Sequence, residues 1–156
     1  MLTRFGCGSA ALGVCQFKNR TRALARLYAD AFAAAPELAT NVEAGHRHNA
    51  ARAAALAGNG RGEDAGNLSP EERTCWRRQA LAWLTMDVAT CTRKLDSGIA
   101  GDRALVRRTL TGWLAEPDFA GVRERDSLGS FPAEERDEWL ALWKKVAALL
   151  ALKLDA

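Results

Sequence analysis

Glu43 and His46 have the spacing of the Glu-x-x-His pairs that bind di-iron centres in helical bundles. Such a centre takes two of these pairs and further glutamates from facing helices, and the sequence holds no second Glu-x-x-His. His46 and His48 are the two histidines of the chain, and a separation of two residues places them about 200° apart on a helix. They cannot bind the same ion while that helix is regular. We therefore expect neither a metal site nor a cofactor.

Motifs of the common hydrolases and nucleotide-binding proteins do not occur, since the sequence has no G-x-S-x-G, H-E-x-x-H or P-loop string. The paired carboxylates Glu71–Glu72 and Glu134–Glu135 fall in the first turns of predicted helices. There the positive end of the helix dipole stabilises them without a catalytic role. We assign no catalytic residue. A small hydrolase or metal-dependent enzyme with an unrecognised site is the first alternative to a non-catalytic function.

Six arginines form two loose groups, which are Arg73, Arg77 and Arg78, and then Arg103, Arg107 and Arg108. Acidic residues lie among them, and the net charge of the whole chain is only +3. Both facts favour solvated helix faces with intrahelical ion pairs over a stripe that follows a phosphate backbone. A helical nucleic-acid-binding domain is the second alternative, and nucleic acid is not the partner we expect.

Length and composition limit the class of protein. The 156 residues are 48% hydrophobic and 26% charged, which is the balance of one globular domain and not of a disordered chain. The longest uninterrupted apolar run covers residues 146–152, far fewer than the ~20 residues that a membrane span requires. We expect a cytoplasmic protein without a membrane segment.

Four cysteines stand at positions 7, 15, 75 and 91, and none of them forms a C-x-x-C pair. We expect no disulfide framework, with Cys75 and Cys91 buried in helices as small hydrophobic residues. Residues 1–19 differ from the rest, and Gly6–Ala11 formally fits the G-x-G-x-x-A fingerprint. No apolar strand precedes this run, so we interpret residues 1–19 as a poorly ordered arm and not as a phosphate-binding loop.

Helical periodicity dominates from Arg22 onward, and no stretch alternates with period two over more than a few residues. An apolar stripe predicts a first helix that Pro36 ends. A second helix is predicted from Glu37 or Thr40 to Ala57, after which Gly58–Gly62 begins a loop. The two helices together form a predicted hairpin over residues 20–58.

Ser69, Pro70 and Glu72 give the clearest local signal, a capping box with proline in the first turn. The helix that follows is predicted to reach about Leu95. Asp102 is predicted to cap a shorter helix, and a last helix should begin near Pro132. The chain's five tryptophans lie on the apolar stripes, so we expect them in the core. The sequence thus predicts an all-α fold of about five helices, with one domain over residues 20–156 and capping helices over 69–153.

The first hairpin resembles a tetratricopeptide repeat, because Leu24–Phe32 followed by Pro36 fits the pattern of its first helix. Longer strings resemble the C-terminal region of planctomycete-type tetratricopeptide-repeat proteins, which are often fused to Ser/Thr protein kinases. These strings are Leu27–Phe32, Gly45–Ala51, Ala53–Ala65, Arg77–Leu84, Pro117–Arg123 and Phe131–Trp139. They are structural patterns distributed over roughly residues 21–150, which is most of the chain, and they indicate a lineage more directly than an activity.

The resemblance implies a tetratricopeptide-like hairpin followed by a three-helix C-terminal cap in a bacterial protein. It also implies a non-catalytic interaction or scaffold module with a protein or peptide partner, and a homo-oligomer is a further option. Kinase activity is not implied, since the sequence lacks the kinase glycine loop, H-R-D and D-F-G. Two positions depart from the family: His48 replaces an aromatic residue, and Arg52 replaces a small residue or cysteine.

The predicted partner-binding residues are Asn49, His46, Arg47 and Arg52, on the second helix of the hairpin. Asparagine is a mediocre helix former, so Asn49 in an alanine-rich helix calls for an explanation. The structural explanation is an inter-helix hydrogen bond from its amide to a backbone carbonyl. The functional explanation is a clamp on the backbone of a partner, with Arg47 or Arg52 paired to a carboxylate.

Overall fold

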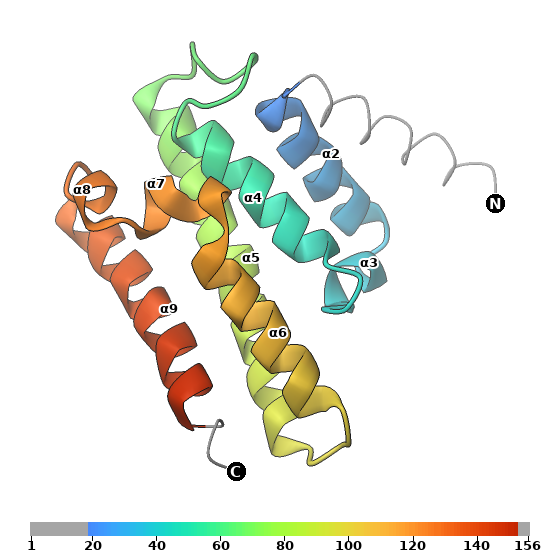
Figure 1. The fold of residues 1–156 in the computed structure, drawn as a ribbon. Helices are drawn as coiled ribbons and strands as arrows, with labels where there is room; N and C mark the ends of the chain where they lie inside the picture. The colour runs from blue at the N-terminus through green and yellow to red at the C-terminus, as the bar shows by residue number, and fades with distance from the viewer. Residues whose placement is uncertain (1–18, 153–156) are drawn as a thin grey trace. The chain divides into compact units, whose positions relative to one another are not determined.

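The computed structural model describes residues 19–152, and every regular element in this part of the chain is helical (Figure 1). The predicted all-α fold is therefore confirmed. The elements in chain order are α2 (Thr21–Ala34), α3 (Glu37–Thr40), α4 (His46–Gly58), α5 (Pro70–Asp96), α6 (Asp102–Ala115), the 3-10 helix η1 (Pro117–Phe119), α7 (Ala120–Arg123), α8 (Arg125–Leu128) and α9 (Ala133–Leu152). Apart from Asn19, the predicted N-terminal arm lies outside the described residues.

The sequence predicted about five helices, and the described residues contain eight α-helices. Five of these, α2, α4, α5, α6 and α9, have at least 13 residues. The remaining three, α3, α7 and α8, have four residues each and lie in the connections. Single turns of this length carry no apolar periodicity, and so the helical pattern in the sequence did not reveal them.

The described chain clusters into two compact units, and the division falls inside α5, between Trp83 and Leu84. We refer to residues 19–83 as the N-terminal unit and to residues 84–152 as the C-terminal unit. Each has its own pattern of packing.

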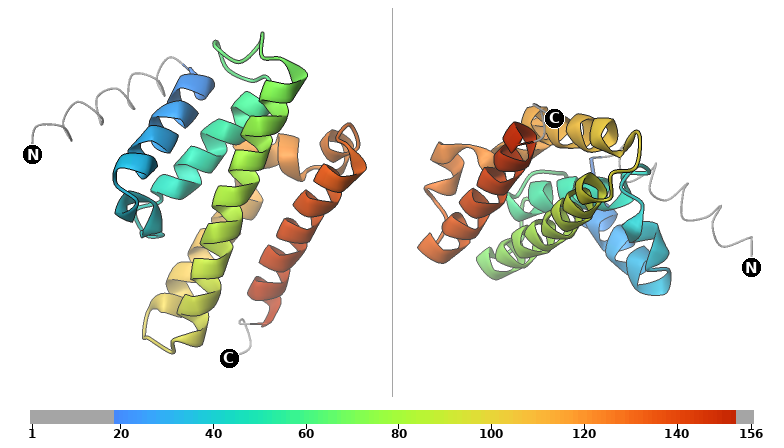
Figure 2. Two further views of the ribbon diagram at one scale, coloured as in Figure 1. Left: turned by 180° about the vertical axis from the view of Figure 1, so that it is seen from behind. Right: turned by 90° about the horizontal axis from the view of Figure 1, so that it is seen from below.

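Helices α2 and α4 lie side by side and run antiparallel in the N-terminal unit (Figures 1 and 2). Alanine provides most of the buried surface of α4, at positions 50, 51, 53, 54, 55 and 57. Such small side chains let neighbouring backbones approach closely, which suits a tightly packed hairpin. Larger groups gather at one edge, where Phe32 contacts both Tyr28 and Trp83 with ring centroids 5.8 and 5.7 Å apart.

The prediction of the second helix is wrong for its first part, because the helix is interrupted between α3 and α4. Gly45 has a φ of 70°, in the left-handed region that glycine adopts without strain, and it precedes the first residue of α4. The Asn41 Oδ1 atom accepts a hydrogen bond from the Ala44 N–H at 3.1 Å. This Asn-initiated turn competes with the helix and ends α3 at Thr40.

The start of α5 confirms the predicted capping box. The Ser69 N–H donates to Glu72 Oε2 at 2.9 Å, and the Glu72 N–H donates to Ser69 Oγ at 3.2 Å. Pro70 is the first helical residue, as predicted. The hydrogen bond from the Ser69 backbone lowers the pKa of the Glu72 carboxyl, so the capping carboxylate is ionised at neutral pH.

Large side chains fill the C-terminal unit. Trp113, Phe119 and Trp139 are each at most 1% exposed. Trp143 stacks on Trp139 with a centroid separation of 6.4 Å, and its Nε1–H donates to the Val122 carbonyl at 2.8 Å. The prediction of core tryptophans is thus confirmed for Trp83, Trp113, Trp139 and Trp143, which are all buried.

Two details differ from the sequence predictions. Trp76 is only half-buried, against the small cluster of Ala57, Ala65 and Leu68. Cys75 is exposed whereas Cys91 is buried, so the predicted burial is wrong for Cys75. Cys75 lies about 200° around α5 from the buried Arg77, on the opposite face of the helix.

No helix within residues 19–152 combines the length and the apolar character needed to cross a membrane.

Candidate functional site

Asn49 projects from α4 toward α2, where its side chain hydrogen-bonds to the Tyr28 hydroxyl. The partner across the hairpin is therefore a side chain and not the backbone carbonyl that we expected. Burial raises the pKa of Tyr28 and outweighs both the hydrogen bond from Asn49 and the charge of Arg52, which lower it. The hydroxyl is consequently neutral at physiological pH and acts as a hydrogen-bonding group.

His46, Asn49 and Arg52 follow one another at three-residue intervals along one flank of α4, and all three are half-buried. The Arg52 Nη1–H donates to Asn49 Oδ1 at a long 3.5 Å. We call His46, Asn49 and Arg52 the α4 polar flank. Arg47 does not belong to it, because Arg47 is only 4% exposed and lies on the packed face of α4.

The glycine loop, residues 58–66, connects α4 to the segment before α5. It contains residues 58–65 of the Ala53–Ala65 string named above. Two arginines of α5 fix its ends. The Arg77 Nη1–H donates to the Gly58 carbonyl at 2.9 Å, and the Arg73 Nη2–H donates to the Gly66 carbonyl at 3.0 Å. These guanidinium groups satisfy backbone oxygens that the end of a helix and a loop leave without helical partners.

Asp64 connects the same loop to the start of α2. Its carboxylate accepts hydrogen bonds from the Arg22 and Ala23 N–H groups at 3.1 and 2.8 Å. No side chain of residue 20, the local N-cap position, caps α2. In addition, Thr21 Oγ1 donates to the Arg61 carbonyl at 2.6 Å. Asp64 therefore caps a helix from which it is about 40 residues away in sequence.

These contacts explain the Gly-Asn-Gly-Arg-Gly-Glu-Asp string in structural terms. Its glycines pass close to Arg73, Arg77 and Thr21, and its aspartate caps α2. The sequence predicted this stretch to be a helix stop and a loop, and Ala53–Ala65 to be one of the strings that carry the resemblance, but it did not predict the cap. The signal that could have found the cap was the lack of Ser, Thr, Asp or Asn at residue 20.

The described part of the chain contains few side chains that could act as a nucleophile or bind a metal ion. Burial, together with the charge of Asp87, raises the pKa of the Cys91 thiol to about 12. Cys91 therefore lacks the thiolate that a nucleophile needs at neutral pH. Glu43 lies in the turn before α4, so it does not share a helix with His46. Among residues 19–152 no cluster of three or more His, Cys, Asp or Glu side chains could hold a metal ion.

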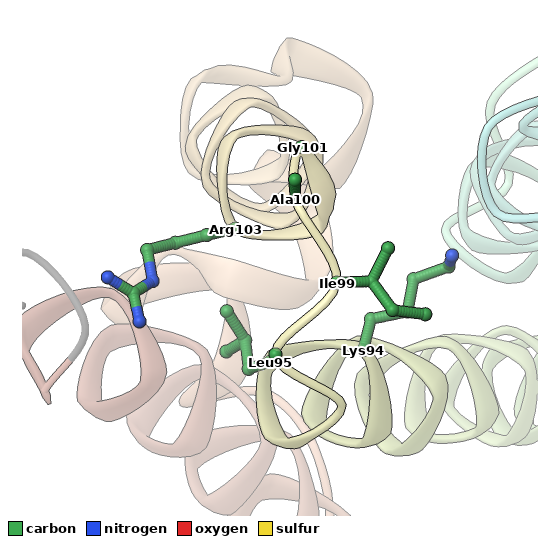
Figure 3. Close-up of a pocket in the computed structure, with 7 residues that line it drawn as sticks. Lys94, Leu95, Ile99, Ala100, Gly101 and Arg103 are labelled. Atoms are coloured by element: carbon green, nitrogen blue, oxygen red, sulfur yellow. The ribbon is translucent and has the colours of Figure 1, made fainter.

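A pocket of about 240 Å³ lies in the C-terminal unit where α5 passes into α6 (Figure 3). Lys94, Leu95, Ile99 and Arg103 contribute the large side chains of its lining. Ile99 and Lys94 project to one side of the connecting loop and Arg103 to the other, with Leu95 between them (Figure 3). Pockets that bind drug-sized ligands measure about 300–1,000 Å³, so this pocket is smaller and suits a single side chain better than a cofactor.

Asp102 does not cap α6, contrary to the prediction. Gly101 occupies the N-cap position without a side-chain cap, and Asp102 is the first helical residue. The Asp102 carboxylate instead accepts hydrogen bonds from Lys94 Nζ and Ser97 Oγ, each at 3.3 Å. These contacts pin the loop back onto the end of α5.

Comparison of the chain with protein-family models, with curated proteins and with solved structures found no match.

Proposed function

We propose that this chain is a non-catalytic interaction module of tetratricopeptide type, which acts in the cytoplasm and binds a protein or peptide through its first hairpin. The observation that carries the proposal is the α4 polar flank. It places an amide and a guanidinium side by side, half-buried, in a helix whose other inward positions are mostly alanine.

The chemistry of the flank suits an extended peptide. An asparagine amide offers two N–H donors and one carbonyl acceptor, which is the complement of a peptide backbone. A guanidinium next to it can form two parallel hydrogen bonds to a carboxylate. The 3.5 Å contact between Arg52 and Asn49 is at the outer limit of a hydrogen bond, so a partner that replaces it forfeits little internal energy.

Tyr28 supports the flank from α2. Its ring packs against Phe32, and its neutral hydroxyl holds the Asn49 side chain in place. A preorganised donor loses less side-chain entropy on binding than a free one. Arg47 is not part of the proposed surface, because its side chain is buried.

The test is selection of a displayed random peptide library against the purified chain, followed by affinity measurement with the enriched peptides. We expect Asn49→Ala and Arg52→Ala each to weaken binding at least about tenfold. Arg78→Ala is the matched control, since Arg78 is exposed on α5 and its loss removes the same charge. It should leave the affinity unchanged.

Thermal unfolding of Asn49→Ala separates the two explanations of this residue. A lower Tm with unaltered peptide affinity would mean that Asn49 only joins the two helices. A library that yields no specific peptide, or peptides indifferent to both substitutions, would contradict the proposal. Turnover of ester, glycoside or phosphate substrates would favour the enzyme alternative, and steeply salt-dependent retention on DNA would favour the nucleic-acid alternative.

A further inference from the structure

The α5–α6 tip, which we define as residues 93–108, contains the most exposed large hydrophobic side chain of the described residues. Ile99 is 63% exposed and stands in a loop in which residues 96–101 are all exposed. The loop is nevertheless ordered by hydrogen bonds of its own. Ser97 Oγ donates to the Lys94 carbonyl at 2.8 Å, and the Asp102 N–H donates to the Ile99 carbonyl at 3.3 Å. An apolar side chain is thus held outward on a fixed support.

The tip also concentrates the positive charge of the molecule. Residues 93–108 contain five basic and two acidic side chains, a net charge of +3, which equals the net charge of the entire chain. The other 140 residues therefore sum to zero. A local excess of this kind attracts acidic partners and increases their rate of association.

The arrangement of the side chains specifies the partner further. Lys94 and Arg103 project to opposite sides of the loop, and Leu95 and Ile99 provide apolar surface next to them (Figure 3). A segment that crosses the loop would meet apolar surface at its centre and a cation on either side. The Lys94 ammonium contacts Asp102 Oδ1 at 3.3 Å and keeps two further N–H donors for a carboxylate of the partner. The pocket of about 240 Å³ has room for one apolar side chain at that centre.

From this geometry we infer that the α5–α6 tip binds an acidic protein segment in which one apolar side chain is flanked by carboxylates. The occupant is a protein and not a nucleic acid, because residues 93–108 include no aromatic side chain on which bases could stack. It is not a membrane, because one exposed isoleucine inserts too little apolar surface for stable anchoring. This inference does not depend on the α4 polar flank.

The experiment is a ¹H–¹⁵N NMR titration of the full chain with short synthetic peptides. The first peptide is glutamate-rich with one central leucine, the second replaces the leucine by serine, and the third replaces every glutamate by glutamine. We expect the first peptide to shift the amide signals of Leu95, Ile99 and Arg103. The second and third should bind about tenfold more weakly, through loss of apolar contact and of charge, respectively.

Matched variants assign the effect to the tip. Ile99→Ser should weaken the first peptide about tenfold, whereas Met86→Ser, at a residue that is 51% exposed elsewhere on α5, should not. Arg103→Gln should weaken it, whereas Arg78→Gln should not. Because Ile99 and Arg103 are exposed, these variants retain the fold, which their own spectra will verify.

Several results would overturn the inference. They are equal affinity for the leucine and serine peptides, signal shifts that map outside residues 93–108, or indifference to Ile99→Ser. Stronger binding at the tip by a single-stranded oligonucleotide, or by vesicles containing phosphatidylserine, would also overturn it. Asn49→Ala should leave binding at the tip unchanged, so this inference and the proposed function can fail separately.

Discussion

The two compact units achieve close packing by opposite means. In the N-terminal unit, six buried alanines of α4 and the glycine loop bring backbones together, and arginine and aspartate side chains hold the loop through backbone hydrogen bonds. In the C-terminal unit, tryptophan, phenylalanine and leucine side chains fill the interior. Small residues leave no room for an added atom, whereas large residues leave a void when they are shortened. The two units should therefore be sensitive to opposite kinds of substitution.

Shortening a large core residue of the C-terminal unit should have the largest effect. Trp139 is 0% exposed and stacks on Trp143, so Trp139→Ala should lower the free energy of unfolding by about 3–5 kcal/mol. Urea unfolding followed by far-UV circular dichroism measures this loss. Leu140→Ala is the control on the same helix, at a residue that is 45% exposed, and should cost about 0.5 kcal/mol or less. Equal losses for the two variants would contradict the core assignment of Trp139.

Adding a single methyl group should damage the N-terminal unit. Alanine normally stabilises a helix relative to glycine, but a Cβ atom at Gly58 would lie 2.9 Å from the Arg77 backbone nitrogen and 3.0 Å from the Arg73 carbonyl oxygen. Gly58→Ala should therefore destabilise the protein by about 1–3 kcal/mol in the same urea experiment.

Gly66→Ala is the control for this steric argument, since nothing lies within 4 Å of a Cβ atom at Gly66. It should be neutral to within about 0.5 kcal/mol. If Gly58→Ala proved stabilising, the close approach of α4 and α5 at this point would be refuted.

Loss of the long-range cap should have a smaller effect. Asp64→Ala leaves the Arg22 and Ala23 N–H groups without their acceptor and should cost about 1 kcal/mol, measured as a fall in Tm and in the urea midpoint. The neighbouring substitution Glu63→Ala removes an exposed carboxylate and keeps every backbone hydrogen bond of the loop. An equal response of both variants would indicate a general charge effect instead of a cap.

The smallest effect belongs to the local cap of α5, and it depends on pH. The folded-state pKa of Glu72 is lowered, so its ionised form contributes stability that is present above the unfolded value of 4.5 and is lost as the pH falls through the folded-state pKa. Glu72→Gln should lower Tm at pH 7, and the difference from the unaltered protein should shrink below pH 4.5. Glu71 takes no part in the capping box, so the variant Glu71→Gln provides the comparison at each pH. A difference in Tm that grows as the pH falls would contradict a stabilising role of the ionised Glu72 carboxylate.

Local signals in the sequence were sufficient for the helical class, the start of α5 and the approximate position of α9. A capping box joins residues three apart, and apolar periodicity is visible within a few turns, so neither depends on the rest of the fold. The candidate site was predictable only in part. Asn49 and Arg52 were identifiable as polar residues in an alanine-rich helix, but the alanine-rich sequence of α4 does not specify which of its faces is packed.

Tertiary structure alone decided the remaining features. It buried Arg47, exposed Cys75, gave Asn49 the hydroxyl of Tyr28 as its partner, and assigned the cap of α2 to Asp64. Each outcome depends on residues about 20 or more positions apart in sequence, or on which face of a helix meets its neighbour. Arginine and cysteine occur on buried as well as on exposed faces of helices, so the residue type does not show which face is buried. Only the packing of the helices against one another decides this.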